Sequence, residues 1–273
     1  MVINGKEIAN IIEVRIKRDI AKTTIKPRLA VVLVGDDPAS AVYVKRKFEA
    51  ASRVGIRVDL HHFLKNAPEE KVFELLDKLN FDASVHGIII QIPLPKHLDT
   101  DALLNYVVPW KDVDGIGAEN LTGLAHGDPY FIPGAAGAVL EVLKKGRVSI
   151  PGKHAVVVGA GRVAGSPISS VLLKHGATVT MTTEHTKDLK LHTKKADILV
   201  SAAGVPGLIT YSHVKKEAAV IDVGISRVKG KVLGDVDPKV ATKASLFTPV
   251  PGGVGPITVA KLLENVVIAS QIQ

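Results

Sequence analysis

Polar side chains follow the buried strand that the sequence predicts at residues 87–90. This run, GIII, is wholly apolar and indicates a strand covered on both faces, and Gln91 follows it directly. Asp112 and Asp114 lie on a later loop, in the sequence PWKDVDG. Open α/β sheets bind ligands beside the carboxyl ends of their strands, so an amide and carboxylates here indicate a site for a small polar heterocycle. The alternative is a turn at a strand end with solvated acids.

Tyr43 and Lys47 have the spacing of two groups that act together. They lie one turn apart on a predicted helix, so their side chains share a face and can reach one substrate. A Tyr-x-x-x-Lys pair also marks short-chain dehydrogenases, but there it follows the nucleotide-binding turn, whereas here it precedes the glycine-rich segment that begins at Gly159. The order along the chain therefore excludes that class. An ordinary amphipathic helix whose lysine reaches out to solvent is the remaining alternative.

Alternating strands and helices must position these residues. Apolar runs and capping residues predict the elements of a βαβαβ unit with right-handed parallel crossovers. The expected elements are strands at 29–35, 57–62 and 87–90 and helices at 38–54, 69–79 and 134–145, with Asp37 as the cap of the first helix and Pro38 at its first position. The last of these helices leads out of the unit.

A nucleotide-binding signal opens the second half of the chain. A strand at 154–158 runs into GAGRVAG, in which Gly159 and Gly161 allow a tight turn and a close approach of the backbone to a pyrophosphate. The helix that follows offers unpaired N–H groups and the positive end of its dipole. Gly165 comes one place later than in G-x-G-x-x-G, so a turn needed only for packing is the alternative. Further strands are expected at 178–182, 198–201 and 219–223.

A loop rich in proline and glycine precedes the last predicted helix, at 259–268. The segment 248–258, TPVPGGVGPIT, contains three prolines and three glycines. This composition predicts an irregular, rigid loop whose exposed backbone lets a planar ligand approach closely. An inert hinge between domains is the alternative, although linkers are usually polar.

Composition restricts the class of protein. The 273 residues suffice for one large or two ordinary α/β domains. A formal net charge of +8 suits a nucleic-acid binder or an enzyme of anionic substrates, but basic residues are interspersed with acids and aromatic residues make up only 4%. Nucleic acid is therefore the weaker partner. Cysteine is absent, and the N-terminal segment has the pattern of an amphipathic helix rather than a signal peptide, so we expect a cytoplasmic protein with no metal site and no membrane partner.

Several short motifs occur together along the chain. SAVYVKRKFEAA carries Tyr43 and Lys47, and QIPLP and KDVDG follow it. The proline-glycine segment reads TPVPGGVGP, and DVGI and GDVD stand at 222–225 and 234–237. Over nearly its full length the chain thereby resembles the bifunctional methylenetetrahydrofolate dehydrogenase/cyclohydrolase family. This combination is far more specific than a glycine turn alone.

The resemblance implies an enzyme that oxidises 5,10-methylenetetrahydrofolate to the methenyl cation with NADP and hydrolyses the cation to 10-formyltetrahydrofolate. Lys47 would then transfer the proton of the hydrolysis, Gln91 would position and polarise around it, and Tyr43 would pack against the folate. Asp114 would accept hydrogen bonds from the pterin ring. Further implied substrate-binding residues are Pro251, Gly252 and Gly253.

The same resemblance implies a set of cofactor-binding residues and a set of partners. The cofactor residues would be Gly159, Ala160, Gly161, Arg162, Gly165, Glu184 and Ile225. The expected partners are a folate, with or without a polyglutamate tail, and a second copy of the chain in a homodimer. A surplus of lysine and arginine would attract the glutamate tail.

The chain departs from the family in three places. The usual Pro-Cys-Thr-Pro reads Pro-Gly-Ala-Ala at 133–136, which removes a threonine hydroxyl expected near the site. Ala160 replaces an arginine expected to bind phosphate, although Arg162 is adjacent. Glu184 stands where a carboxylate would bind an unphosphorylated ribose or repel a 2′-phosphate. Because Arg162, His185 and Lys187 surround this corner, NADP is the predicted cofactor and NAD the alternative.

The prediction is a two-domain α/β enzyme. Residues 1–138 with 258–273 would form an N-terminal βαβ domain that binds folate and carries the catalytic residues, so that the C-terminal helix returns to the first domain. Residues 139–257 would form a Rossmann-like nicotinamide-binding domain. Two alternatives stay open: another two-domain dehydrogenase, such as a shikimate-type enzyme, and, less favoured, a basic nucleic-acid-binding protein.

Overall fold

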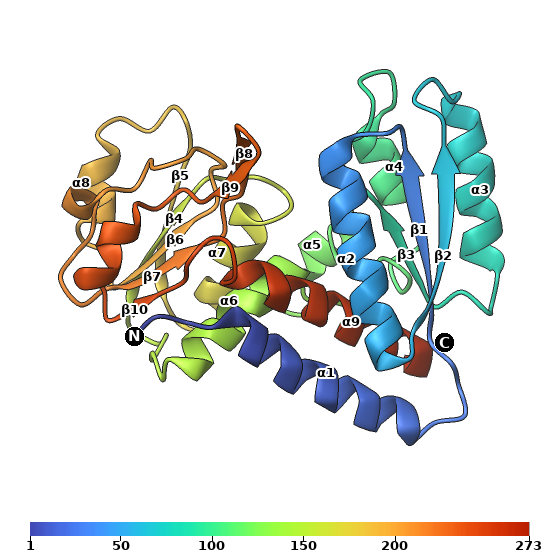
Figure 1. The fold of residues 1–273 in the computed structure, drawn as a ribbon, viewed down its shortest axis with the longest axis horizontal. Helices are drawn as coiled ribbons and strands as arrows, with labels where there is room; N and C mark the ends of the chain where they lie inside the picture. Colours follow the sequence, from blue (N-terminus) through green and yellow to red (C-terminus); the bar gives the residue numbers. More distant parts are fainter. Residues whose placement is uncertain (273) are drawn as a thin grey trace. The chain divides into compact units, whose positions relative to one another are not determined.

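The chain divides into two compact α/β units. The computed structural model describes residues 1–272, except the side chains of residues 38 and 39. Residues 11–133 and 259–273 belong to one unit, here called the three-stranded unit, and residues 1–10 and 134–258 to the other, the five-stranded unit. The boundary falls within the first helix, α1 (Gly5–Ala21), and the last, α9 (Val254–Ile272) (Figure 1).

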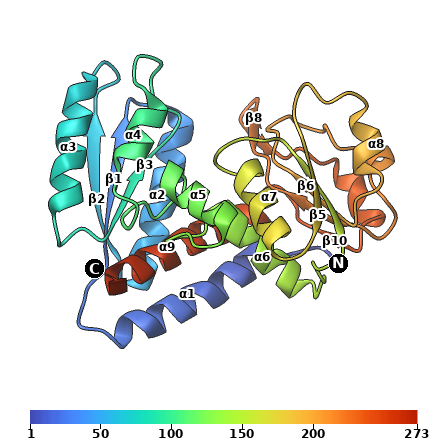
Figure 2. The ribbon, with the colours of Figure 1, turned by 180° about the vertical axis from the view of Figure 1, so that it is seen from behind.

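The three-stranded unit is built on a parallel sheet in the order β2-β1-β3. Its strands are β1 (Arg28–Val34), β2 (Arg57–Phe63) and β3 (Gly87–Ile90), and its further helices are α2 (Pro38–Val54), α3 (Glu69–Phe81), α4 (Thr100–Tyr106) and α5 (Ala118–His126). Figures 1 and 2 view this unit from opposite sides and place α2 on one face of the sheet and α4 on the other.

Alternating residues of these strands supply the core of the three-stranded unit. Ala30, Val32 and Val34 of β1 point to one face, as the period of two requires, and pack with Val72 and Leu76 of α3. All four residues of β3 are buried, as expected for a strand covered on both faces. The predicted βαβαβ unit is confirmed, and its strands and helices agree with the predicted ranges to within two residues.

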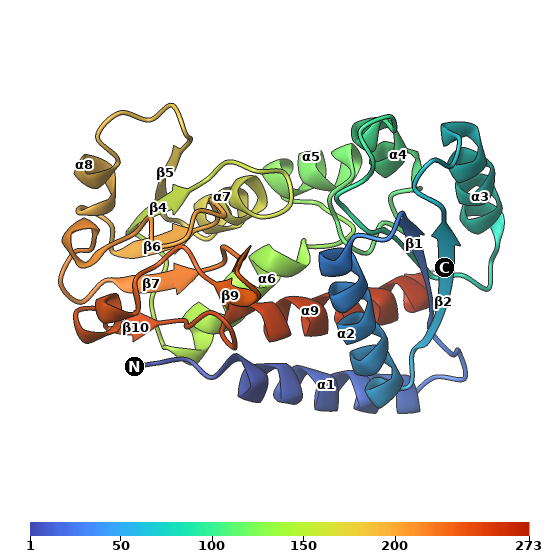
Figure 3. The same ribbon diagram turned by 45° about the horizontal axis from the view of Figure 1, so that its top comes forward.

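The five-stranded unit contains a parallel sheet in the order β10-β7-β6-β4-β5. The strands are β4 (His154–Val158), β5 (Thr178–Thr182), β6 (Ile198–Ser201), β7 (Ala219–Asp222) and β10 (Leu246–Phe247), and β8 (Ser226–Val228) pairs with β9 (Lys231–Leu233) in a separate hairpin. The helices are α6 (Gly134–Lys145), α7 (Gly165–Lys174), α8 (Leu189–Thr193), η1 (Tyr211–His213) and η2 (Pro238–Thr242). Figure 3 shows the strands in this order.

The strand order of the five-stranded sheet identifies where a ligand should bind. β4 lies between β5, which follows it in the sequence, and β6, so the winding reverses between β4 and β6. Doubly wound sheets bind nucleotides in the crevice at this switch point, beside the carboxyl ends of the strands. The glycine turn after β4 and the segment after β6 both lie at this edge.

The units differ from the predicted domains at their boundaries. Residues 1–10 belong to the five-stranded unit because the N-terminal segment lies alongside β10 and the loop after it. Ile3 N donates to Phe247 O at 2.8 Å, and Gly5 N donates to Gly252 O at 2.9 Å. Residues 134–138, which the prediction assigned to the first domain, belong to the five-stranded unit with the rest of helix α6. The C-terminal part of α9 returns to the three-stranded unit as predicted, where Asn265 Nδ2 donates to Val113 O at 2.9 Å.

The prediction of an irregular segment over 248–258 is wrong in its second half. Helix α9 begins at Val254, so the irregular loop covers only 248–253. Pro256 fits the first turn of α9 because the N–H that proline lacks has no intrahelical partner there. Among the described residues, every helix is too short or too polar to span a membrane.

Candidate active site

A hydrogen bond joins Lys47 and Gln91, two predicted site residues that lie on different elements of the three-stranded unit. Lys47 Nζ, from α2, donates to Gln91 Oε1 at 3.2 Å. Gln91 is buried, with only 8% of the residue exposed, and its Nε2 donates to Ile92 O at 2.8 Å. Because that second bond uses the amide's donor side, the amide oxygen is directed toward Lys47. Half-buried Tyr43 lies one turn before Lys47 on the same face of α2.

Sequence reasoning missed Ser40, which extends this face of α2 by another turn. Asp37 Oδ2 accepts a 2.7 Å hydrogen bond from Ser40 N and caps the helix, as predicted. The Ser40 residue is only 2% exposed, and its Oγ has no hydrogen-bond partner among the described residues. A buried hydroxyl without a partner is unfavourable unless a ligand completes it. The spacing of Ser40, Tyr43 and Lys47 at helical intervals was the signal that could have found it.

The KDVDG loop runs beside β3, and its two acids, Asp112 and Asp114, lie in different surroundings. Ile88 N donates to Lys111 O at 2.7 Å, and Ile88 and Asp112 form a parallel bridge, so the loop runs toward the same edge as Gln91. The buried Asp112 carboxylate accepts hydrogen bonds from Gly117 N at 2.8 Å and Asn120 Nδ2 at 3.0 Å. Its burial raises the pKa of Asp112. Asp112 therefore shapes the loop, and the expectation that it faces a ligand is wrong.

Asp114 is the acid of this motif that stays available. It is half-buried, and none of the described residues forms a hydrogen bond or ion pair with its carboxylate. The loop around it is fixed from two sides, because Asp112 holds the N–H groups that follow it and Asn265 holds Val113 O. A carboxylate in this arrangement can accept two hydrogen bonds from a planar heterocycle.

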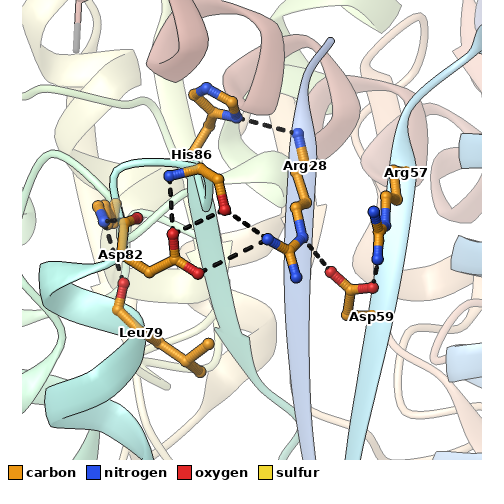
Figure 4. A network of polar contacts seen from close by, with 8 residues as sticks. Arg28, Arg57, Asp59, Leu79, Asp82 and His86 are labelled. Carbon is orange, nitrogen blue, oxygen red and sulfur yellow. Dashed lines mark hydrogen bonds and ion pairs between the residues drawn. The ribbon is translucent and has the colours of Figure 1, made fainter.

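Lys111 anchors the same loop to the end of α3, next to the network around Arg28 and Asp82 that Figure 4 shows. Its Nζ donates to Leu79 O at 3.0 Å and to Asp82 O at 2.8 Å, which satisfies carbonyl groups at the end of α3. Burial lowers the pKa of Lys111. The Arg28 guanidinium lies between Asp59 and Asp82, and Arg28 N donates to His86 Nδ1 at 3.1 Å. This network lies where β1 and β2 begin, away from Gln91, and is structural.

The glycine turn of the five-stranded unit has the close packing of a dinucleotide-binding turn. Gly159 has φ +99°, and a Cβ on it would lie 2.5 Å from Ala202 O. A Cβ on Gly165 would lie 1.9 Å from Gly159 O, so the displaced third glycine still allows α7 to approach the turn. By contrast, nothing lies within 4 Å of a Cβ on Gly161, which faces open space. Ala160 and Arg162 are half-buried beside it.

The other predicted cofactor residues lie at the carboxyl ends of neighbouring strands in the same sheet. Glu184 follows β5 with a side chain 83% exposed, and its Oε1 lies 3.8 Å from His185 Nε2. Lys187 is exposed close by, and Ile225, after β7, is 40% exposed. The strands are parallel, so the structure brings the glycine turn, Glu184 and Ile225 to one edge.

The proline-glycine loop is tied to this edge through Thr248. Thr248 is fully buried, and its Oγ1 accepts a 2.7 Å hydrogen bond from Asp222 N at the end of β7. Pro251 is exposed, whereas Gly253 is packed so closely that a Cβ would lie 2.5 Å from Pro249 O. Gly252 is half-buried with φ +101°. Their predicted role in substrate binding stays a prediction.

The family models account for both units. Residues 3–114 match the catalytic domain of tetrahydrofolate dehydrogenase/cyclohydrolase, and residues 133–273 match the NAD(P)-binding domain of the same family. The chain belongs to the tetrahydrofolate dehydrogenase/cyclohydrolase family. The resemblance inferred from the short motifs is thereby confirmed.

Individual members of the family resemble the chain over its whole length. It is 43% identical to the bifunctional protein FolD of Exiguobacterium sibiricum, with 99% of each chain covered. The crystal structure of the bifunctional FolD enzyme of Campylobacter jejuni is 40% identical and superposes with a TM-score of 0.96, covering 100% of this chain and 99% of that one. The FolD of Trypanosoma brucei, solved with NADP and an inhibitor, is 35% identical with a TM-score of 0.95, covering 100% and 97%.

These findings confirm the predicted enzyme class over both alternatives. The chain is a bifunctional dehydrogenase and cyclohydrolase of tetrahydrofolate one-carbon metabolism, and its five-stranded unit is the NAD(P)-binding domain of the family. The two-domain α/β fold is confirmed with it. Within residues 1–272, no cluster of histidine and acidic side chains has the arrangement of a metal site.

The family departure at 133–136 has a structural basis. Gly134 begins α6, and a Cβ on it would lie 2.9 Å from Thr258 O of α9. Ala135 and Ala136 are buried in the same turn. Small residues here allow α6 to pack closely on α9, so this segment serves packing in the tetrahydrofolate dehydrogenase/cyclohydrolase fold of this chain.

Proposed function

We propose that the chain oxidises 5,10-methylenetetrahydrofolate with NADP to the methenyl cation and hydrolyses this cation to 10-formyltetrahydrofolate, with Lys47 as the proton-transfer group. The observation that carries the proposal is the hydrogen bond from Lys47 to the buried amide of Gln91, in a chain of the dehydrogenase/cyclohydrolase family. This hydrogen bond holds the amine of Lys47 in a fixed position beside the end of β3, and general acid–base catalysis requires a proton-transfer group that is held in position.

The hydrolytic step gives Lys47 and Gln91 separate tasks. Water adds to the bridge carbon of the methenyl cation, one of its two protons is released to solvent and the other is transferred to N5, and the bond from this carbon to N5 breaks, which leaves the formyl group on N10. Lys47 moves the proton between water and N5. Gln91, held by its bond to Ile92 O, keeps the lysine amine directed at the reacting carbon.

Three further side chains of the three-stranded unit bind the substrate in this proposal. Asp114 accepts hydrogen bonds from the pterin, since its carboxylate has no partner among the described residues. Tyr43 packs against the folate rings. Ser40, whose buried hydroxyl lacks a partner, hydrogen-bonds to substrate or to the attacking water.

The five-stranded unit binds the cofactor at its switch point. The proposed contacts are Gly159, Ala160, Gly161 and Gly165 at the pyrophosphate and Ile225 beside the nicotinamide, which accepts the hydride when it is bound. Arg162 and Lys187 would pair with a 2′-phosphate and favour NADP. Glu184 opposes this preference, since a carboxylate at this corner binds an unphosphorylated ribose, and NAD is the alternative.

The proposal extends to assembly and location. A homodimer follows from the family resemblance, and a solution mass of twice 28.9 kDa would support it. Substrates with a polyglutamate tail are favoured by the net charge of +8, in which case their KM rises with ionic strength. A cytoplasmic location is compatible with the absence of cysteine.

The test is an absorbance assay for methenyltetrahydrofolate. Purified protein is given methylenetetrahydrofolate with NADP or with NAD, and formation of the methenyl product and its later hydrolysis are followed. Turnover with NADP and decay of the methenyl product faster than without enzyme support the proposal. Absence of turnover with either nicotinamide would overturn it.

A further inference from the structure

Asp235 places a buried carboxylate against the backbone segment that follows β6. The residue is fully buried, and its carboxylate accepts hydrogen bonds from Ala203 N at 2.8 Å, Gly204 N at 3.2 Å and Val205 N at 2.8 Å. Ser201 Oγ donates a further bond at 2.8 Å. Successive backbone N–H groups that converge in this way form an anion-binding nest. Here the anion is supplied by the chain itself.

The segment held by Asp235 forms one wall of the glycine turn. It follows β6, which is adjacent to β4 at the switch point of the sheet. A Cβ on Gly159 would lie 2.5 Å from Ala202 O and 3.1 Å from the Cα of Ala203, so the two segments are in contact. A shift of the segment 202–205 would therefore change the shape of the turn.

A second buried carboxylate fixes Asp235 in turn. Asp222 Oδ1 accepts a hydrogen bond from Asp235 N at 3.1 Å, and its Oδ2 accepts one from Val236 N at 2.9 Å. Two glycines make room for this pair: a Cβ on Gly224 would lie 2.1 Å from Asp235 Oδ1, and a Cβ on Gly234 would lie 2.0 Å from Asp222 Oδ2. Gly224 of the DVGI motif thus makes room for Asp235 of GDVD, and Gly234 of GDVD makes room for Asp222 of DVGI.

We propose that Asp235 is a positioning residue for the dinucleotide: its carboxylate occupies the N–H groups of 203–205 and holds this segment at the distance from the Gly159 turn that the cofactor requires. The inference rests on the proposed cofactor site at that turn. By filling the nest, Asp235 also removes a competing site for the cofactor's phosphates, which leaves the turn and the start of α7 to bind them.

The test is cofactor binding by Asp235→Asn, measured as the dissociation constant of NADPH from its fluorescence. An asparagine oriented to accept from the nest has only one oxygen for four donors, so we expect binding weaker by about tenfold or more. The KM for NADP should rise in parallel while hydrolysis of added methenyltetrahydrofolate, which needs no nicotinamide, stays at the wild-type rate. Asp237→Asn is the matched control: Asp237 belongs to the same motif but caps η2 at the surface through Lys239 N, and its change should leave NADPH binding unaltered.

Gly224→Ala tests the same carboxylate without changing its charge. The added Cβ displaces the Asp235 side chain, so this variant should also bind NADPH less tightly and keep its hydrolytic activity. Wild-type NADPH affinity in both Asp235→Asn and Gly224→Ala would overturn the inference. Parallel loss of cofactor binding and hydrolysis would also overturn it, because it would show a general structural role. Failure of the wild type itself to bind NADPH would instead overturn the proposed function.

Discussion

Lys47 Nζ lies 3.2 Å from Gln91 Oε1, and this hydrogen bond joins the middle of α2 to the end of β3. Gln91 is fixed on its other side by the 2.8 Å bond from its Nε2 to Ile92 O. The lysine is therefore held by a group that is itself buried and hydrogen-bonded. Such support keeps a catalytic side chain in one geometry.

The first prediction concerns this support. Gln91→Leu keeps the size of the side chain and removes its hydrogen bond with Lys47. A hydrogen bond to a charged group contributes about 1.5–3 kcal/mol, which corresponds to roughly tenfold to a hundredfold in rate. We expect the rate of methenyltetrahydrofolate hydrolysis to fall by this factor. NADPH affinity serves as the control and should not change. Hydrolysis at the wild-type rate would show that Gln91 does not position Lys47.

The second prediction separates the two acids of KDVDG. Asp114→Ala should weaken folate binding by about 1.5–3 kcal/mol, because charge-assisted bonds to the pterin are lost, and should leave the melting temperature nearly unchanged. Asp112→Ala should instead lower the melting temperature, because Gly117 N and Asn120 Nδ2 lose their acceptor. Both effects can be read from substrate titration and thermal unfolding. Unaltered folate affinity in Asp114→Ala would return this residue to the interpretation as a solvated acid.

The third prediction concerns the cofactor corner. Arg162→Ala or Lys187→Ala should raise the KM for NADP and leave the KM for NAD nearly unchanged, because only a contact with the 2′-phosphate is lost. Lys195→Ala, which removes an exposed lysine on the same unit, is the control and should change neither. Preference of the wild type for NAD, together with a shift toward NADP in Glu184→Ser, would identify Glu184 as the ribose-binding acid.

The fourth prediction concerns the dependence of stability on pH. Burial, with a further contribution from Asp235, raises the pKa of Asp222 from its ordinary value of 3.8 to about 7. Between these values the folded chain keeps a proton that the unfolded chain releases, so the stability that this group contributes is present below pH 4 and is lost as the pH rises to 7. One proton corresponds to at most about 1.4 kcal/mol per pH unit.

Chemical denaturation of the wild type and of Asp222→Asn between pH 5 and pH 7 measures this contribution. Asparagine cannot ionise, so the free energy of unfolding of Asp222→Asn should decline less with rising pH, or rise more, than that of the wild type. The difference between the two slopes isolates Asp222 from acids whose pKa is lowered, such as Asp59 and Asp197, which act in the opposite direction. Identical slopes would contradict a raised pKa for Asp222.

The strands and the positions of Lys47 and Gln91 could be predicted because local signals determine them. An apolar run such as Gly87–Ile90 indicates a strand, and the residue that follows it must lie at the edge of the sheet. Tyr43 and Lys47 share a face because a helix has a fixed period. The glycine turn was predictable for the same reason, since strand, turn and helix are contiguous.

The remaining features depend on contacts between distant segments. Asp112 and Asp114 are the same residue type, so the sequence does not distinguish them, and the bridge between Ile88 and Asp112 places Asp112 rather than Asp114 beside the strand. The assignment of residues 1–10 to the five-stranded unit depends on pairing with Phe247, at the other end of the chain. Asp235 and the segment 203–205 are likewise far apart in sequence, so the composition of GDVD does not reveal what its first acid binds.

The role of Lys47 is tested most directly by the hydrolysis of methenyltetrahydrofolate by Lys47→Met, with Lys45→Met as the matched control on the same helix. Lys45 has a side chain 77% exposed and pairs only weakly with Glu49, at 4.0 Å. We predict that Lys47→Met loses at least ~10²-fold in hydrolytic rate, the usual contribution of general acid–base catalysis, while it remains folded and binds NADPH like the wild type. Lys45→Met should keep its full rate. Conversion of the methenyl substrate by folded Lys47→Met at the wild-type rate would show that Lys47 is not the proton-transfer group.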